Sequence, residues 1–167
     1  AQRFDGRFED DWMTDHVARH PHEMQYAILC VVMGGVLRRF PDLRFGFLEA
    51  NCSWGPHWLW RMDEHYEVRG SSIERSLPQR PSEYFLRQCF VSVDPDEHTA
   101  GPVMDRIADN VVFSTDYMHP DCIYPNASKT FVQGDWLTDT QKRRILWDNC
   151  LRMYRLDSDE LSRQVGR

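Results

Sequence analysis

The sequence predicts an α/β fold in which parallel strands alternate with helices. One observation is a helical pattern, with apolar residues spaced from Met24 to Val36, that a Pro-Asp break separates from a short apolar run. The other is that two more short apolar runs follow, with helical patterns between and after them. The three runs expected as buried strands are residues 43–50, 88–93 and 111–114. Such alternation is typical of parallel β/α units.

The helices are expected from their apolar spacing and from their first residues. The first 20 residues show no clear period and are expected to form a loop. Pro21 is expected in the first turn of a helix, where a proline is tolerated. The other helices are expected from Pro56, after a cap at Ser82, over Val103 to Ala108, and after a cap at Thr138.

Composition limits the partners that the chain can have. A length of 167 residues allows one domain with a sizeable core. The net charge of −6 and the lack of a block rich in Lys and Arg argue against a nucleic-acid surface. No apolar run approaches the roughly 20 residues that span a bilayer, so no membrane segment is expected.

The cysteines favour a reducing compartment. There are five of them, an odd number, and they are widely spaced without a C-x-x-C pair. Free, buried thiols in the cytoplasm are the favoured interpretation.

Each predicted strand ends at a carboxylate. The first ends at Glu49, the second at Asp94 and the third at Asp116, which His119 follows by three residues. Parallel β/α units place their sites at these strand ends. A carboxylate there can bind a divalent metal or move a proton, although a metal needs donors from several strands.

Each of these residues also has an ordinary structural interpretation. An Asp at a strand end often serves as a turn or cap residue, Glu49 could be buried and paired, and His119 could be a plain loop histidine. The spacing of His16, His20 and His22 is not diagnostic of a metal site. The tryptophans at 54, 58 and 60 favour packing, with Trp58 inside and Trp60 outside.

Three stretches, taken in order, resemble one protein family. They are HPHEMQYAILCVVMGGVLRRFPDLRFGFLEANCSWGPHWLWRMDEHYE (20–67), PSEYFLRQCFVSVDPDE (81–97) and DNVVFSTDYMHPD (109–121). Together they resemble the amidohydrolase-2 group of the metal-dependent hydrolases, which includes relatives of aminocarboxymuconate-semialdehyde decarboxylase. The resemblance covers most of the chain, and its motifs are fairly specific.

The resemblance implies part of a distorted (β/α)8 barrel. Residues 45–50, 89–93 and 111–116 would be its sixth, seventh and eighth strands, so that residues 1–167 would be the C-terminal half of one barrel domain. The N-terminal half, with the family's first-strand and fifth-strand ligands, is expected upstream of Ala1. Three or four strands cannot close a barrel, so this half is an expected partner.

The resemblance also assigns the site. Asp116 falls on the metal-binding aspartate that moves a proton in relatives, and Glu49 replaces a histidine that the decarboxylase relatives use. Asp116 and Glu49 are therefore expected as metal ligands and catalytic groups, with Trp54, His119 and His20 lining the substrate pocket. Zinc is the expected metal, and manganese or iron would suit the same carboxylates.

The expected function is hydrolysis of a C–N, ester or related acyl bond in a small molecule, with Asp116 as ligand and general base. Nonoxidative decarboxylation on the same fold is the alternative reaction. An alternative of another class is a non-catalytic half-barrel, which would bind no metal and would pair its open strand edge at Phe45 with a partner. The sequence leaves open whether the protein forms a homo-oligomer. The fold alone does not decide among these functions.

Overall fold

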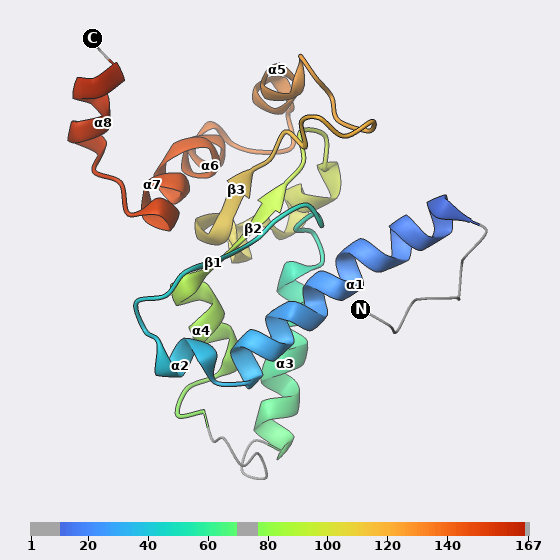
Figure 1. The fold of residues 1–167 in the computed structure, drawn as a ribbon, viewed down its shortest axis with the longest axis vertical. Helices are drawn as coiled ribbons and strands as arrows, with labels where there is room; N and C mark the ends of the chain where they lie inside the picture. Colours follow the sequence, from blue (N-terminus) through green and yellow to red (C-terminus); the bar gives the residue numbers. More distant parts are fainter. Residues whose placement is uncertain (1–10, 70–76, 166–167) are drawn as a thin grey trace.

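The structure is a computed structural model that describes residues 11–69 and 77–165. Three parallel strands form its sheet in the order β1-β2-β3, with β1 at Phe45–Phe47, β2 at Cys89–Val93 and β3 at Val111–Phe113. Phe45 pairs with Cys89, and Val91 pairs with Val111. The predicted α/β class is therefore confirmed, and Figure 1 shows helices on both sides of the sheet.

The outer strands are shorter than expected. The predicted strand at 43–50 is regular only over Phe45–Phe47, and Leu43 and Leu48 on either side of it are exposed. Within the described residues β1 has a neighbour on one side only, so fewer backbone hydrogen bonds extend it. The central strand β2 is buried along its whole length, as its continuous apolar sequence predicts.

Helix α1 spans Trp12–Met33 and corrects two expectations. Residues 12–20 are helical rather than loop, and Pro21 lies inside the helix rather than in its first turn. Local polar contacts outweigh the weak apolar period, because Asp11 caps the helix at the amide of Thr14. The expected loop over residues 1–10 lies outside the described part of the chain.

The helices from α2 to the residues before β3 begin at different positions from those expected. Helix α2 (Val36–Arg39) precedes β1, and α3 spans Gly55–Arg69. Helix α4 (Pro81–Gln88) has Arg80 as its N-cap, so Ser82 is not the cap; its hydroxyl donates to Asp63 at 2.6 Å instead. The helix expected at 103–108 is a 3₁₀ helix over His98–Arg106, followed by another over Ala108–Asn110.

The C-terminal helices cover β3. After α5 (Ala127–Gln133), Thr138 caps α6 (Asp139–Arg143) in a capping box with Gln141, as its sequence predicts. The expected single helix then widens into a π-helical stretch over Arg144–Asp148 before α7 (Asn149–Tyr154) and α8 (Ser158–Val165). Ile145 is fully buried against the core.

Three buried side-chain amides connect the start of each strand to a helix or loop. Gln88 donates to the carbonyl oxygen of Leu43 at 2.9 Å, ahead of β1. Asn110 donates to Cys89 at 2.7 Å, and Asn149 donates to Val111 at 2.6 Å. The bonds to Cys89 and Val111 are buried, and each pairs a carbonyl that would be costly to leave without a partner. The amino ends of the strands are thus fixed by structural contacts, and polar groups at the opposite ends are available for chemistry.

The structure shows the state of the cysteines and the polarity of the helices. All five cysteines are free thiols, but only Cys52 and Cys89 are buried and Cys30 is exposed. In the described part of the chain no helix is both long and apolar enough to cross a membrane.

Candidate metal centre

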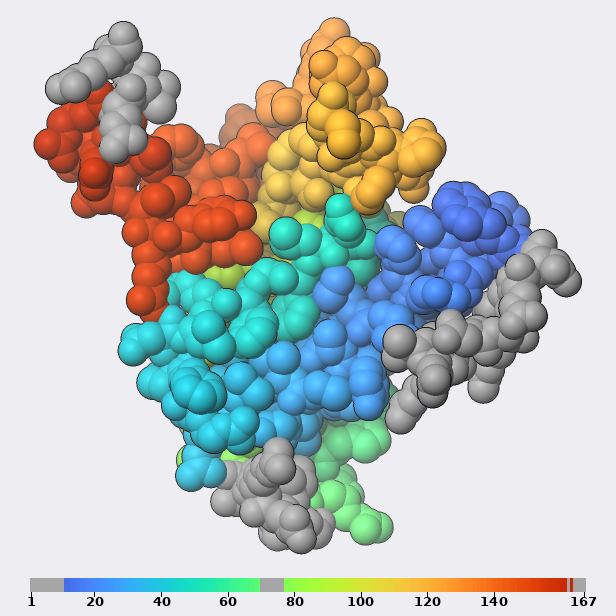
Figure 2. Space-filling model, viewed as in Figure 1, coloured from blue at the N-terminus to red at the C-terminus, as the bar shows by residue number. Residues whose placement is uncertain are grey.

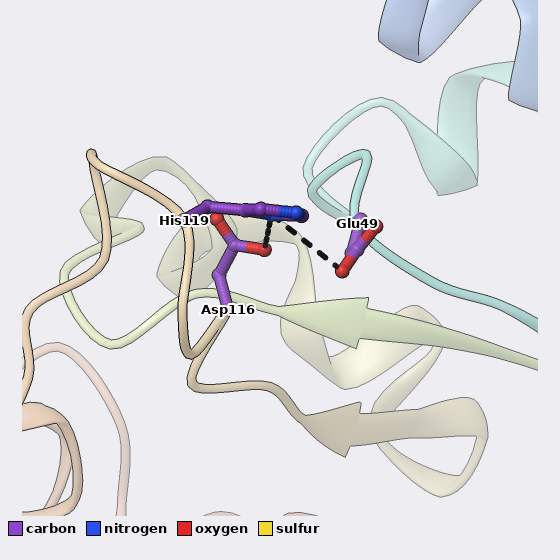
Figure 3. Close-up of side chains that lie close together, drawn as sticks. All are labelled: Glu49, Asp116 and His119. Carbon is purple, nitrogen blue, oxygen red and sulfur yellow. Dashed lines mark hydrogen bonds and ion pairs between the residues drawn. The ribbon is translucent and has the colours of Figure 1, made fainter.

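Three polar side chains converge at the carboxyl ends of the strands. Glu49 follows β1, while Asp116 and His119 follow β3. Each offers one ligand atom, and these atoms all lie within 4.8 Å of one another. Figure 3 shows the imidazole of His119 between the two carboxylates. The parallel sheet produces this meeting, because it aligns the ends of strands that are far apart in sequence.

The imidazole is hydrogen-bonded to one of the two carboxylates. Nδ1 of His119 lies 2.7 Å from Oδ1 of Asp116 and 4.0 Å from Oε1 of Glu49. The hydrogen bond to Asp116 and the charge of that carboxylate raise the pKa of His119, and the charge of Glu49 adds to the shift. The carboxylate and the imidazole can therefore share one proton between oxygen and nitrogen.

The backbone is left-handed where it presents the carboxylates. Glu49 has a φ of 64°, Asn51 of 59° and Asp116 of 51°. Residues with a β-carbon adopt this region at a cost, and such positions gather at functional sites. The conformation is kept because surrounding contacts hold it.

The loop after β1 is attached to β2 and to the residues that follow β2. The amide of Glu49 donates to the hydroxyl of Ser92 at 2.8 Å. The side chain of Asn51 donates to Asp94 at 2.6 Å. Burial and the nearby charge of Glu97 raise the pKa of Asp94 to about 6, with Asp116 adding to the shift.

A cleft of about 490 Å³ opens over these groups. Helix α1 forms one of its walls with three rings spaced four residues apart. The ring of His16 lies 4.8 Å from that of Trp12 and 4.2 Å from that of His20. Nδ1 of His20 donates to the carbonyl oxygen of Glu49 at 3.1 Å. Figure 2 shows the blue surface of α1 beside the cyan surface of the β1 segment. The full lining comprises Trp12, His16, Val17, His20, Pro21, Glu49, Ala50, Asn51, Asp94, Asp116, His119, Pro120 and Asp121.

The donor set fits a divalent cation. Two carboxylates and one imidazole supply oxygen and nitrogen ligands, which suit zinc, manganese and iron. The described lining of the cleft holds four carboxylates but no Lys or Arg, so the positive charge that would balance them is not supplied by a lysine or an arginine. Glu49, Asp116 and His119 are the residues that could hold the metal, with further positions left for other ligands.

The structure brings together most of the residues that the sequence singled out. Glu49, Asp116 and His119 form one cluster, with the side chain of Glu49 half-exposed rather than buried, and His20 joins the wall of the cleft. Trp54 does not line the cleft in the described part of the chain. Its indole nitrogen donates to the carbonyl oxygen of Ala50 at 2.6 Å, and its ring packs against the core.

Other residues of the site were not predicted as such. Asn51 and Glu97 act through contacts across the sheet, and nothing in their own sequence marks them. Trp12 and His16 were hidden in a stretch expected to be loop, where their four-residue spacing was the signal. Asp94 carries the signal that also identified Glu49 and Asp116, a carboxylate at a strand end.

Comparison with known proteins identifies the family of the chain. A profile of the amidohydrolase family matches residues 9–156, which is most of the chain. The chain belongs to the amidohydrolase family.

Several solved structures share its fold. An amidohydrolase from Mycobacterium avium subsp. paratuberculosis K-10 superimposes with a TM-score of 0.70 at 16% identity, over 84% of this chain and 35% of that one. The 5-carboxyvanillate decarboxylase of Sphingomonas paucimobilis gives 0.59 at 22% identity, over 78% and 39%. A dihydroxybenzoic acid decarboxylase from Polaromonas sp. JS666, with bound manganese and the inhibitor 2-nitroresorcinol, gives 0.63 at 19% identity, over 81% and 41%. The chain thus spans about two fifths of the length of these amidohydrolase barrels.

Proposed function

We propose that this chain contributes a metal-binding and proton-transfer site to a hydrolase that cleaves a C–N, ester or related acyl bond in a small molecule. The observation that carries the proposal is the convergence of Glu49, Asp116 and His119 at the strand ends. Membership of the amidohydrolase family supports the same chemistry. The remaining ligands would come from the N-terminal half of the same barrel.

Glu49 and Asp116 would hold the metal through carboxylate oxygens, with His119 as a third donor or as the proton carrier. Zinc is the first choice, and manganese or iron would suit the same oxygens. Such a metal, when bound, lowers the pKa of water toward neutrality and polarises the substrate carbonyl.

Asp116 and His119 would carry out the proton transfers. As water attacks the acyl carbon, a carboxylate oxygen of Asp116 accepts the proton of the water and a new C–O bond forms. The bond from the acyl carbon to nitrogen or oxygen then breaks, and the same proton moves to the leaving group. The new carboxylic acid releases a second proton, and His119, 2.7 Å from Asp116, is placed to carry that one outward.

Decarboxylation of an aromatic acid is the second candidate, because solved structures with this fold include two decarboxylases of such acids. There a C–C bond would break, and a proton from the Asp116 and His119 pair would replace carbon dioxide. Hydrolysis remains the proposal, because Glu49 stands where the decarboxylase relatives that the sequence resembles use a histidine.

An oxygen-labelling assay separates the two reactions. The protein that carries this chain would be loaded with zinc or manganese and given aryl esters, aryl amides and dihydroxybenzoates in ¹⁸O-water. Hydrolysis places ¹⁸O in the acid product, whereas decarboxylation yields carbon dioxide and an aromatic product that contains no ¹⁸O. Asp116→Asn is expected to lower either rate by about 100- to 10,000-fold. Asp42→Asn, in an exposed ion pair with Arg155, is the matched control and should keep the rate. Turnover that survives Asp116→Asn would refute the proposed role.

A further inference from the structure

The segment from Glu49 to Ser53 is held by β2 and the residues after it at three separate points. Ser92 accepts the amide of Glu49, and Asp94 accepts the side chain of Asn51. The third point is Glu97, which lies beyond the end of β2. Of the three residues that hold the segment, Glu97 makes the largest number of contacts, and it is not one of the residues that line the cleft.

The carboxylate of Glu97 is an acceptor for several donors. Its side chain is buried, with 8% of the residue exposed. Oε1 accepts the amide of Cys52 at 2.9 Å, the amide of Ser53 at 2.8 Å and the hydroxyl of Ser53 at 2.5 Å. Oε2 accepts the amide of Asp94 at 3.4 Å, so one carboxylate bridges two loops.

This carboxylate lies near the start of α3. The amides that it accepts, those of Cys52 and Ser53, lie in the turn before Gly55, the first residue of the helix. A negative charge is favourable at this end of the helix dipole. The cost of burying the Glu97 carboxylate is offset by the charge-assisted hydrogen bonds that it accepts. Burial and the charge of Glu97 also raise the pKa of the Cys52 thiol, which keeps it protonated.

The bridge lies next to two residues that need external support. Glu49 and Asn51 both have left-handed backbones, and such conformations persist only where surrounding structure fixes them. Glu97 fixes the two residues that follow Asn51. Without this bridge the segment can relax, and the Glu49 carboxylate then turns away from Asp116.

We infer that Glu97 is a positioning residue, which fixes the segment 49–53 and thereby directs the Glu49 carboxylate toward Asp116 and His119. The inference rests on the proposed metal centre. It assigns Glu97 no contact with substrate or metal. Outer contacts of this kind tune metal sites, and their loss costs about 10- to 100-fold in affinity or activity.

The test is Mn²⁺ binding, by isothermal titration calorimetry, to the full-length protein that carries this chain. Glu97→Gln keeps the shape of the side chain and removes its charge, and it should weaken Mn²⁺ binding by about 10- to 100-fold. Glu64→Gln, on an exposed face of α3, is the matched control and should bind as the wild type does. Ile145→Val loosens a distant part of the core, so unchanged affinity there excludes general destabilisation as the cause.

A second readout needs no metal. Amide hydrogen exchange in residues 49–53 should speed up in Glu97→Gln, while exchange in residues 139–154 should not change. If Glu97→Gln does not fold, Ser53→Ala removes one bond to the same carboxylate and should weaken Mn²⁺ binding by less than about tenfold.

The outcomes separate the two proposals. Wild-type chain that binds no Mn²⁺ would overturn the metal centre and this inference with it. Wild-type binding with equally tight binding by Glu97→Gln, or by Ser53→Ala in its place, would overturn the inference alone. Weaker binding in the variant, with faster exchange confined to 49–53, would support both.

Discussion

The two walls of the candidate metal centre are built differently. The segment after β1, which carries Glu49, is attached to β2 and its following loop by hydrogen bonds, of which the bond to Ser92 is half-buried and the bond to Glu97 is buried. The segment after β3 is held mainly by contacts within itself, such as the amide of His119 to the carbonyl oxygen of Asp116 at 3.0 Å. Tyr117 and Met118 on that segment are exposed at 59% and 76%.

This difference indicates how the two walls would act. The Glu49 wall is preorganised, because its polar groups are paired across the sheet before any ligand arrives. The Asp116 wall is supported from beneath by apolar packing and has few polar contacts to fix its loop. We expect it to gain order when a ligand binds, as segments with exposed backbone contacts do.

The largest expected effect comes from removing the apolar support of the Asp116 wall. Phe131 is fully buried and packs on Phe113 of β3, with ring centroids 4.8 Å apart, and on Trp136. Phe131→Ala should lower the free energy of unfolding by about 3–5 kcal/mol, measured by urea denaturation. A loss below 1 kcal/mol would show that β3 does not depend on this packing.

A smaller effect is expected from one polar contact of the Glu49 wall. Ser92→Ala removes the acceptor for the amide of Glu49 and leaves a partly buried donor without a partner. The free energy of unfolding should fall by about 1–2 kcal/mol in the same assay. Ser82→Ala, which removes a hydroxyl bonded to Asp63 on α3, is a comparison away from the site, and it should not change hydrogen exchange at residues 49–53.

The pH dependence of stability should report on Asp94, which accepts the side chain of Asn51 and lies near the charge of Asp116. Its pKa rises from an ordinary 3.8 to about 6 in the folded chain, so the folded state holds the proton more tightly than the unfolded state. Stability therefore falls as the pH rises from about 4 to 6, because Asp94 then becomes charged in a fold that favours its protonated form. Asp94→Asn should remove this loss and be more stable than the wild type at pH 7 by about 1 kcal/mol, because solvent screens a partly exposed group.

The matching measurement is thermal unfolding of both proteins at pH 4 and pH 7. The advantage of Asp94→Asn over the wild type should grow between the two values. An advantage that is the same at both would contradict the raised pKa.

The smallest expected effect on stability belongs to the Asp116 wall. The side chain of His119 is exposed at 60%, so His119→Gln should leave the urea midpoint unchanged. Its affinity for Mn²⁺ should nevertheless fall, because one nitrogen donor of the cluster is lost. If His119→Gln binds Mn²⁺ as tightly as the wild type does, His119 is not a metal ligand and only lines the cleft.

The sequence predicts those parts of the site that follow from strand ends. The apolar runs before Glu49, Asp94 and Asp116 indicated parallel strands, and a parallel sheet brings their carboxyl ends to one edge. The start of α1 could not be found in this way, because its polar residues carry no apolar period and its cap at Asp11 is a local contact.

Contacts across the sheet were beyond the reach of sequence patterns. Glu97 lies 45 residues from Cys52, and only the folded chain shows that its carboxylate accepts the amide there. Trp54 shows the converse case, because its side chain returns to the carbonyl of Ala50 and packs on the core instead of facing the cleft. The direction of one side chain in the turn before α3 decided this, and composition does not encode it.

The most direct test of the metal centre is elemental analysis of the purified protein for zinc, manganese and iron, for the wild type and for Asp116→Asn. With three converging donors we predict about one metal per chain in the wild type and little or none in the variant. A wild type without metal, even after dialysis against zinc or manganese, would contradict the account. So would a variant that keeps its metal.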